Sequence, residues 1–462
     1  MNSAARTFAL VGLVAAILLA MHMLPTIHVN GQELRAVNIL SDILPEPYQQ
    51  KYSIDVIPRP DPPKPMEPVD SMATKPFVEY RPEGVTLIDD YSEGLPGGMD
   101  HFYGALDSLS VLQRPLRIAY FGDSFVEGDI LTAHIRERLQ ERFGGSGVGW
   151  ADPGNKINGF RQTVRQRFKG FREYEVVEKP FDYRCQGINQ RYFVPEEGAS
   201  VWTRGTDYCP HAADWQQATL FLRADQAVTV EVNIDDTDEW TAYQLEGSDR
   251  LQSIEIRRPM HSVSYRFRDI GQGTYVHGMA LEDTTGITLD NFSMRGSSGL
   301  TLSRLPADLL ADLARQRTYD LIVLHFGLNV VSERTHAANY KAHIRRMADV
   351  VALMRQTYPK ASVLVVSVPD RDQRTPAGIR TMNGVESLVG YQQLLASDCH
   401  VAFFNLFQAM GGRESMKQLV DRQLANKDYT HLKHKGGEEL SKPFFDSLMA
   451  GYENYHRRKG YE

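Results

Sequence analysis

The sequence predicts an α/β fold in which a parallel β-sheet, covered by helices, is interrupted by an inserted all-β segment. Two observations support this prediction. Short apolar runs alternate with helical patterns on both sides of residues 150–290, whereas residues 150–290 themselves contain only strand patterns and turns. We therefore divide the chain into an apolar N-terminal segment (1–24), a proline-rich linker (25–113), an α/β domain (114–149 and 291–462) and an all-β insertion (150–290).

The elements of the α/β domain follow one another regularly. Residues 118–121 are typical of a short buried strand, and the helix after it ends at Gly144-Gly145, since glycine pairs stop helices. Beyond residue 300 we expect strands over 321–326, 363–368 and 401–406, and helices around 340–358, around 386–396 and after Gly436-Gly437. Strands that alternate with helices in this way favour a parallel sheet with both faces covered.

The insertion carries the period of two that β-strands require. Thr219-Leu-Phe-Leu-Arg, Val228-Thr-Val-Glu-Val-Asn and Ser262-Val-Ser-Tyr-Arg-Phe alternate or run as strands, and glycine and aspartate separate them. We expect these strands to form a β-sandwich between the first two strands of the α/β sheet.

The N-terminus and the composition limit the function. Arg6 precedes an apolar run from Phe8 to Met21, which is shorter than a typical span of about 20 residues. Because no small-x-small cleavage site follows, an uncleaved signal anchor is the first interpretation and a cleaved signal peptide is the second. Both export the chain to a periplasmic or cell-surface location, and the anchor would tether it to the inner membrane. The net charge of -7 argues against nucleic acid as a partner.

The cysteines leave one question open. Cys185, Cys209 and Cys399 have no metal-ligand spacing, and no group of His, Asp or Glu has one either, so we expect no metal and no cofactor. Cys185 and Cys209 form a disulfide or remain two buried thiols, and the sequence does not choose between them.

Polar residues suited to catalysis lie where the expected strands end. Ser124 follows the first strand in Tyr120-Phe-Gly-Asp-Ser124, and Gly299 follows the strand near residue 292. Asn329 follows the next strand, and Asp428 and His431 lie between the last strand and the final helix. Since ligands of open α/β sheets bind outside the carboxyl ends of the strands, these residues are expected to meet.

Their chemistry predicts a serine hydrolase. Ser124 is the candidate nucleophile, His431 its general base, and Asp428 the carboxylate that orients the imidazole. The oxyanion that forms needs donors, and we assign the backbone N–H groups of Ser124 and Gly299 and the side-chain amide of Asn329. Gly296 lies in the same loop as Gly299 and is the alternative there.

Three neighbouring residues receive structural roles. Asp123 is expected to be a turn or capping residue rather than a catalytic carboxylate, because its charge would lie next to the nucleophile. His325 is expected to be a packed or hydrogen-bonded histidine, and His434 to lie at a solvated helix start.

These motifs resemble the SGNH (GDSL-type) hydrolases, whose blocks are Gly-Asp-Ser, a glycine, Gly-x-Asn and Asp-x-x-His. The segments Gly122-Asp-Ser-Phe-Val-Glu-Gly-Asp129, Gly147-Val-Gly149 and Phe407-Gln-Ala-Met-Gly-Gly-Arg-Glu-Ser-Met416 are similar to the peptidoglycan O-acetylesterase branch. The resemblance implies a flavodoxin-like three-layer sandwich with an inserted domain like a carbohydrate-binding module. It also implies deacetylation of an O-acetylated glycan, most directly peptidoglycan.

The chain departs from the family pattern at Phe125, where leucine is common, and at Val330, where many members are acidic. Both positions bear on the oxyanion hole and the substrate. Two other functions use the same scaffold: an O-acetyltransferase acting on an envelope polysaccharide, and a non-catalytic glycan-binding protein.

The aromatic residues of the insertion have two interpretations. Trp202, Trp215, Trp240 and Tyr243 are suited to stack on sugar rings, or they belong to the core of the β-sandwich.

Overall fold

The computed structural model describes residues 13–14, 28–29, 32–33, 60–63, 78–332, 335 and 337–460. The chain forms two units, Met1–Asp55 and Val56–Glu462. In the first unit, β1 (His28–Val29) pairs antiparallel with β2 (Gln32–Glu33). The predicted signal segment, apart from two residues, and most of the predicted linker up to residue 77 lie outside the described residues. Within the ranges given above, no helix is long and apolar enough to cross a membrane.

The second unit contains the predicted parallel sheet. Its strands lie in the order β14 (Ile287–Ser293), β4 (Leu116–Gly122), β15 (Leu321–His325), β16 (Ser362–Val366), β19 (Ala402–Phe404) and β3 (Asp89–Asp90). All neighbouring pairs are parallel except β19 with β3. In chain order the parallel strands are therefore arranged 2-1-3-4-5, as in flavodoxin-like folds. Ligands bind such sheets where the order reverses, which here is between β4 and β15.

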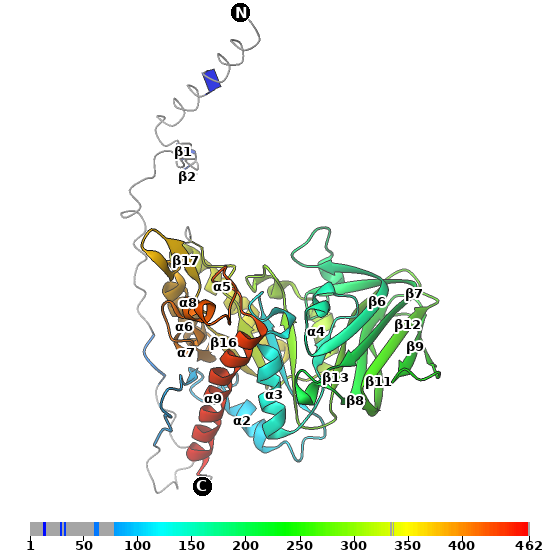
Figure 1. The fold of residues 1–462 in the computed structure, drawn as a ribbon. Helices are drawn as coiled ribbons and strands as arrows, with labels where there is room; N and C mark the ends of the chain where they lie inside the picture. The colour runs from blue at the N-terminus through cyan, green and yellow to red at the C-terminus, as the bar shows by residue number, and fades with distance from the viewer. Residues whose placement is uncertain are drawn as a thin grey trace, which may run out of the picture. The chain divides into compact units, whose positions relative to one another are not determined.

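The described part of this unit contains the four predicted helices, whose ends differ by a few residues, and four more that the sequence did not predict. Together they are α2 (Asp100–Asp107), α3 (Thr132–Phe143), α4 (Ala307–Gln316), α5 (Ala337–Thr357), α6 (Val385–Asp398), α7 (Leu406–Ala409), α8 (Ser415–Asp421) and α9 (His434–Lys459). Helices α3 and α9 pack side by side (Figure 1). The final helix begins at His434, so that Gly436 and Gly437 lie in its first turn rather than before it.

The folded domain begins earlier than residue 114. Strand β3 joins the sheet, and α2 buries Phe102, Tyr103 and Leu106 in the same core as β4. The buried Ser362 hydroxyl fixes this segment, because it donates to Gly98 O at 2.6 Å and accepts from Phe102 N at 3.1 Å. The glycine- and proline-rich stretch before α2 concealed the folded segment in the sequence.

The insertion is an antiparallel nine-stranded sheet. Its strands are β5 (Gly149–Ala151), β6 (Val164–Glu175), β7 (Arg191–Gly205), β8 (Trp215–Ala224), β9 (Val228–Ile234), β10 (Thr241–Leu245), β11 (Ser248–Met260), β12 (Ser262–Arg268) and β13 (Thr274–Glu282). The long β7 pairs with β6, β12 and β13, so all nine strands belong to one hydrogen-bonded network, and the expected β-sandwich stays a prediction. Trp215, Tyr265 and Met279 belong to its own hydrophobic core.

The chain returns to the parallel sheet at Ile287, which the sequence placed after residue 290. Strand β14 contains Thr288, Asp290 and Asn291, and such polar residues are typical of a strand with one face in solvent. In the structure both faces of β14 are covered. Their polar groups have partners: Asn291 Nδ2 donates to Val126 O at 2.7 Å, and Arg317 forms an ion pair with Asp290 at 2.7 Å.

A buried ionic cluster joins the insertion to the parallel sheet. Glu282 at the end of β13 accepts from Arg117 on β4 and from Arg317, each at 2.8 Å. Tyr319 donates to Asp290 on β14 at 2.6 Å. Since Glu282 is fully buried, its two arginine partners are required to keep it ionised there.

Candidate active site

Ser124 lies in the loop that leaves the carboxyl end of β4. Asp123 shapes this loop, because its carboxylate accepts from Phe125 N at 3.0 Å. The other carboxylate oxygen accepts from Gly327 N at 3.2 Å and Leu328 N at 3.1 Å, in the loop after β15. Burial raises the pKa of Asp123 to about 6, against the opposing effect of these backbone bonds. Asp123 is thus the turn residue that the sequence predicted, and it also ties the two loops of the switch point together.

The structure brings Ser124, His431 and Asp428 into one hydrogen-bonded chain. Ser124 Oγ lies 2.9 Å from His431 Nε2, and His431 Nδ1 lies 2.8 Å from Asp428 Oδ2. The second oxygen of Asp428 accepts from the backbone N–H groups of Thr430 and His431, at 3.0 and 3.1 Å. The carboxylate is therefore fixed by its own loop, and the imidazole is held with Nε2 toward the serine.

The carboxylate and the imidazole are accessible to solvent. The side chain of Asp428 is 48% exposed and that of His431 is 40% exposed. Partial burial raises the pKa of Asp428, but the hydrogen bonds from His431 and the two backbone N–H groups outweigh it and hold the pKa below its ordinary value. Asp428 is therefore ionised at neutral pH and accepts from the imidazole.

Two glycines allow the start of α9 to pack closely, Gly437 against the serine loop and Gly436 against Leu424. A Cβ at Gly437 would overlap the carbonyl oxygen of Ile130, and one at Gly436 would overlap that of Leu424. Ile130 lies six residues after Ser124, and Gly437 lies six residues after His431. The absence of side chains at the start of α9 is what lets the two segments pack this closely.

Asn329 and Gly299 meet at Ser297, a residue that the sequence analysis did not single out. Asn329 Nδ2 donates to Ser297 O at 3.0 Å, and Gly299 N donates to Ser297 Oγ at 3.0 Å. The N–H of Gly299 is thus engaged within its own loop, whereas one N–H of the exposed Asn329 amide remains available. Ser297 is buried, so its bonds hold both residues in place.

The glycine at position 299 is required for packing. Its φ of 86° favours glycine, and a Cβ there would lie 2.8 Å from the Phe326 ring and 2.9 Å from Met347 Sδ. By contrast, Gly296 has open space around it.

Arg371 is a second residue that the sequence analysis missed. Its Nη1 donates to Leu328 O at 2.8 Å and to Val331 O at 3.0 Å, on both sides of Asn329. Burial lowers the pKa of Arg371, against the opposing fields of Asp428 and Asp123. Arg371 follows β16 at the carboxyl edge of the sheet. Its place after a predicted strand could have identified it from the sequence as a candidate residue of the site.

The other histidines of this region do not contact Ser124. His325 Nδ1 lies 3.0 Å from Tyr120 OH, and burial lowers the pKa of His325 to about 3, so it is a packed neutral residue as predicted. His434 is the first residue of α9 and is half-buried beside the Tyr208 ring, at 6.0 Å between centroids, where a solvated position was expected. No group of three or more His, Cys, Asp or Glu within the described part of the chain is placed to hold a metal ion.

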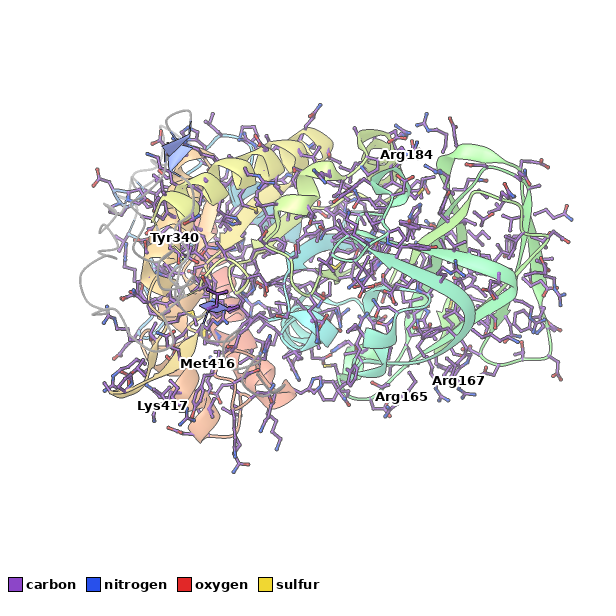
Figure 2. All side chains as sticks on the ribbon, turned by 90° about the horizontal axis from the view of Figure 1, so that it is seen from above. Arg165, Arg167, Arg184, Tyr340, Met416 and Lys417 are labelled. Atoms are coloured by element: carbon purple, nitrogen blue, oxygen red, sulfur yellow. The ribbon has the colours of Figure 1, made fainter. Side chains whose placement is uncertain are left out.

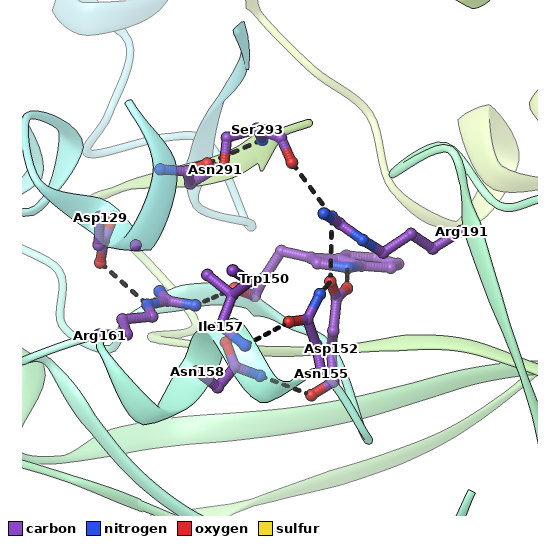
Figure 3. Close-up of a pocket in the computed structure, with 11 residues that line it drawn as sticks. Asp129, Trp150, Asp152, Asn155, Ile157, Asn158, Arg161, Arg191, Asn291 and Ser293 are labelled. Carbon is purple, nitrogen blue, oxygen red and sulfur yellow. Dashed lines mark hydrogen bonds and ion pairs between the residues drawn. The ribbon is translucent and has the colours of Figure 1, made fainter. Parts of the chain in front are cut away.

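The insertion supports the segment that follows Ser124 (Figure 3). A cavity of about 30 Å³, large enough for a water molecule, is lined by Asp129, Asp152, Arg161, Arg191 and their neighbours. Arg161 Nε and Thr163 Oγ1, from the insertion, donate to Asp129 at 3.1 and 2.9 Å. Burial raises the pKa of Asp129, but Arg136 and Arg161 outweigh it and keep the pKa well below its usual range.

The predicted aromatic residues divide into two groups. Trp215 is fully buried and Tyr243 packs against the core of the insertion, so the core interpretation holds for both. Trp202 is half-buried and Trp240 is exposed, with the guanidinium groups of Arg167 and Arg266 over their rings at 4.3 and 4.1 Å. Cys185, Cys209 and Cys399 are all free, which settles the choice between a disulfide and thiols.

The parallel sheet with its inserted β domain, and the hydrogen bonds that join Ser124, His431 and Asp428 at its carboxyl edge, agree with the resemblance to SGNH-type hydrolases noted in the sequence. A solved structure described as "Peptidoglycan O-acetylesterase in action, 5 min" has this fold: the TM-score is 0.65 at 22% identity, over 79% of this chain and 99% of that chain. No family model and no curated protein matches the sequence.

Two family two carbohydrate esterases are less similar. The structure from Cellvibrio japonicus has a TM-score of 0.26 at 8% identity, over 63% of this chain and 99% of its own. The one from Clostridium thermocellum, in complex with cellohexaose, has a TM-score of 0.26 at 10% identity, over 58% and 99%. Such scores are too low to carry an argument.

Proposed function

We propose that the protein is a serine esterase that removes O-acetyl groups from a glycan, and that the glycan is peptidoglycan. The observation that carries this proposal is the chain of hydrogen bonds from Ser124 Oγ to His431 (2.9 Å) and from His431 to Asp428 (2.8 Å). This arrangement activates a hydroxyl that is otherwise a poor nucleophile at neutral pH.

In the first half-reaction Ser124 Oγ attacks the acetyl carbonyl carbon. His431 Nε2 accepts the hydroxyl proton, and ionised Asp428 stabilises the imidazolium that results. Collapse of the tetrahedral intermediate breaks the bond to the sugar oxygen, which leaves with the proton from His431. The product is a free sugar hydroxyl and an acetyl-serine.

The developing oxyanion is stabilised by the Ser124 N–H and by the N–H of Asn329 that is not bonded to Ser297. Gly299 becomes the third donor when its N–H leaves Ser297 Oγ for the oxyanion. Asp123 and Arg371 are positioning residues, because Asp123 binds the backbone before Asn329 and Arg371 binds it on both sides.

In the second half-reaction water replaces the sugar. His431 removes a proton from water, which attacks the acetyl-serine and releases acetate. The 40% and 48% exposure of His431 and Asp428 favours hydrolysis over transfer to a second sugar, because a transferase has to exclude water from its acyl-enzyme.

Two observations support the proposed substrate and the proposed location. The TM-score of 0.65 to a structure described as a peptidoglycan O-acetylesterase favours that glycan. The apolar run at residues 8–21 favours export, with residues 1–24 as a signal anchor or a cleaved signal peptide and the following linker as a spacer. We therefore place the catalytic domain outside the cytoplasm.

Acetate release tests the proposal. The purified full chain is expected to release acetate from O-acetylated peptidoglycan and from 4-nitrophenyl acetate, and Ser124→Ala is expected to lose at least about 10³ in kcat/KM on both. Folded wild-type protein that releases no acetate from either substrate would exclude the esterase. Release from the small ester alone would exclude peptidoglycan as the substrate.

A further inference from the structure

One outer face of the insertion is strongly cationic. Strand β6 carries Arg165, Arg167 and Lys169 at alternate positions, so all three side chains point to the same face of the sheet. Across the pair, Trp202 on β7 lies opposite Arg167, and Arg204 lies opposite Arg165. We call these five residues the β6–β7 cationic face.

This face is solvated and its charges are not neutralised. Arg165, Arg167, Lys169 and Arg204 are exposed, and none of the four is in an ion pair with another described residue. Figure 2 shows Arg165 and Arg167 next to each other at the surface. On the same pair of strands, Val164 of β6 and Val201 of β7 lie in the core of the insertion. In a chain with a net charge of -7, such a concentration of free cations marks a surface for an anionic partner.

Trp202 positions the side chain of Arg167 through a cation–π contact. The Arg167 guanidinium lies over the Trp202 ring at 4.3 Å, and this cation–π contact holds it on the sheet. All of its N–H donors then remain free for a carboxylate, which guanidinium binds in a two-point geometry. The cationic face ends toward β9, where Glu231 pairs with Arg266 and Arg268.

The face begins beside the catalytic serine loop. Thr163, the residue before β6, donates to Asp129 at 2.9 Å, and Asp129 lies five residues after Ser124. The opposite strand ends at the same place, because Gly205 pairs with Val164. From Arg165 to Lys169 the strand extends roughly 13 Å away from this point, at about 3.3 Å per residue. A chain that leaves the active site in this direction passes over the cationic residues.

We propose that the β6–β7 cationic face is a binding site for a polyanionic glycan, in which Arg165, Arg167, Lys169 and Arg204 bind carboxylates along the polymer that is deacetylated at Ser124. The proposal rests on the esterase function for its substrate, and it adds a second site that acts by charge. Binding at this site retains the polymer while the acetyl groups near Ser124 are removed.

Binding is measured with a Ser124→Ala chain, so that no reaction occurs. The probes are insoluble peptidoglycan and the same peptidoglycan with its carboxylates converted to amides, in a sedimentation assay at 50 and 300 mM salt. Arg165→Gln/Arg167→Gln/Lys169→Gln is expected to bind the native polymer about tenfold more weakly, because three exposed contacts are lost. The matched control removes three exposed cations elsewhere, in Arg258→Gln/Lys341→Gln/Lys360→Gln, and is expected to bind normally.

Two further results are expected. Amidation of the polymer and 300 mM salt each weaken binding of the parent chain more than that of the triple variant, because both act on the same charges. With Ser124 restored, the triple variant hydrolyses 4-nitrophenyl acetate at the wild-type rate, which separates failure of this site from failure of the esterase. Arg204→Gln alone, expected to weaken binding about twofold to threefold, replaces the triple variant if that one does not fold.

Equal binding of the triple variant and the control to native peptidoglycan would overturn the proposal. Equal binding of the parent chain to native and amidated polymer would overturn it as well. Tighter binding to phosphatidylglycerol vesicles than to peptidoglycan would assign the face to a membrane surface instead.

Discussion

Replacement of Glu282 by glutamine tests whether the buried ionic cluster holds the insertion on the catalytic domain. Glu282 accepts from Arg117 at 2.8 Å and from Arg317 at 2.8 Å, and it is fully buried. In Glu282→Gln the charge is lost, and the new amide donors face the donors of two arginines that remain buried. We expect the variant to be less stable at pH 7.

The expected loss of unfolding free energy in Glu282→Gln follows from the shifted pKa of Glu282. Burial raises its pKa, but Arg117 and Arg317 outweigh this and lower the pKa from 4.5 to about 2. That difference corresponds to roughly 3 kcal/mol of folding free energy at about 1.4 kcal/mol per tenfold change in proton affinity. It agrees with the roughly 3–5 kcal/mol that removal of one partner from a buried ion pair costs.

The sign of the pH dependence is determined by the lowered pKa. The stabilising contribution is complete above pH 4.5, where the unfolded glutamate is ionised, and it is lost as the pH falls toward the folded value of about 2. The difference in unfolding free energy between wild type and Glu282→Gln should therefore be about 3 kcal/mol at pH 7 and roughly 1 kcal/mol smaller at pH 3.5.

Urea denaturation of both chains at the two pH values measures these differences, and Glu255→Gln, an exposed residue on β11, is the control. A destabilisation below 1 kcal/mol at pH 7, or a difference that does not shrink at pH 3.5, would refute this reasoning.

Two more predictions concern the active site. Asn329→Ala removes an oxyanion donor, so kcat for 4-nitrophenyl acetate should fall by about 10²–10³ while KM changes little; an unchanged kcat would exclude Asn329 from the oxyanion hole. Gly437→Ala places a Cβ against the carbonyl oxygen of Ile130, so thermal denaturation should report a loss of roughly 1–3 kcal/mol and kcat should fall as His431 is displaced. Gly390→Ala, whose Cβ meets nothing within 4 Å, should retain both stability and activity, and a Gly437→Ala chain that behaves in the same way would contradict the packing argument.

The insertion has a structural part in the active site as well as the binding role proposed for it. Arg161 and Thr163 bind Asp129, which belongs to the loop that carries Ser124. After β14, Thr301 Oγ1, two residues beyond Gly299, donates to Gln190 Oε1 of the insertion at 2.5 Å. The loop of Ser124 and the loop of Ser297 and Gly299 are therefore both held by residues of the insertion, and neither is formed by the parallel sheet alone.

Local patterns in the sequence were sufficient for the parallel sheet and for the residues at its carboxyl edge. Residues 118–121, 321–324 and 363–366 are continuous apolar runs, because both faces of their strands are buried, and such runs can be recognised without knowledge of a partner strand. Strand β14 was assigned too late because Asp290 and Asn291 resemble surface residues until Arg317 and Val126 supply their partners. Segment 78–113 was assigned to the linker because its prolines and glycines are frequent, although α2 buries Phe102 and Leu106.

By itself, the sequence determined which chemistry the edge of the sheet offers. Ser124, Asn329, Asp428 and His431 each follow a recognisable strand, and their side chains have the functions that ester hydrolysis needs. Spacing along the chain predicts which edge of the sheet a residue occupies, since all parallel strands end there.

Tertiary structure alone decided how these groups contact one another. Asn329 bonds Ser297, which is 32 residues earlier in the chain, and Arg371 bonds backbone carbonyls 40 and 43 residues before it. The Gly299 N–H, in turn, is taken up by Ser297 within its own loop. The cationic face likewise depends on the register of β6 against β7, which places Arg167 over Trp202. Hydrogen-bond partners and strand register are set by the packing of distant segments, and no local pattern in the sequence records them.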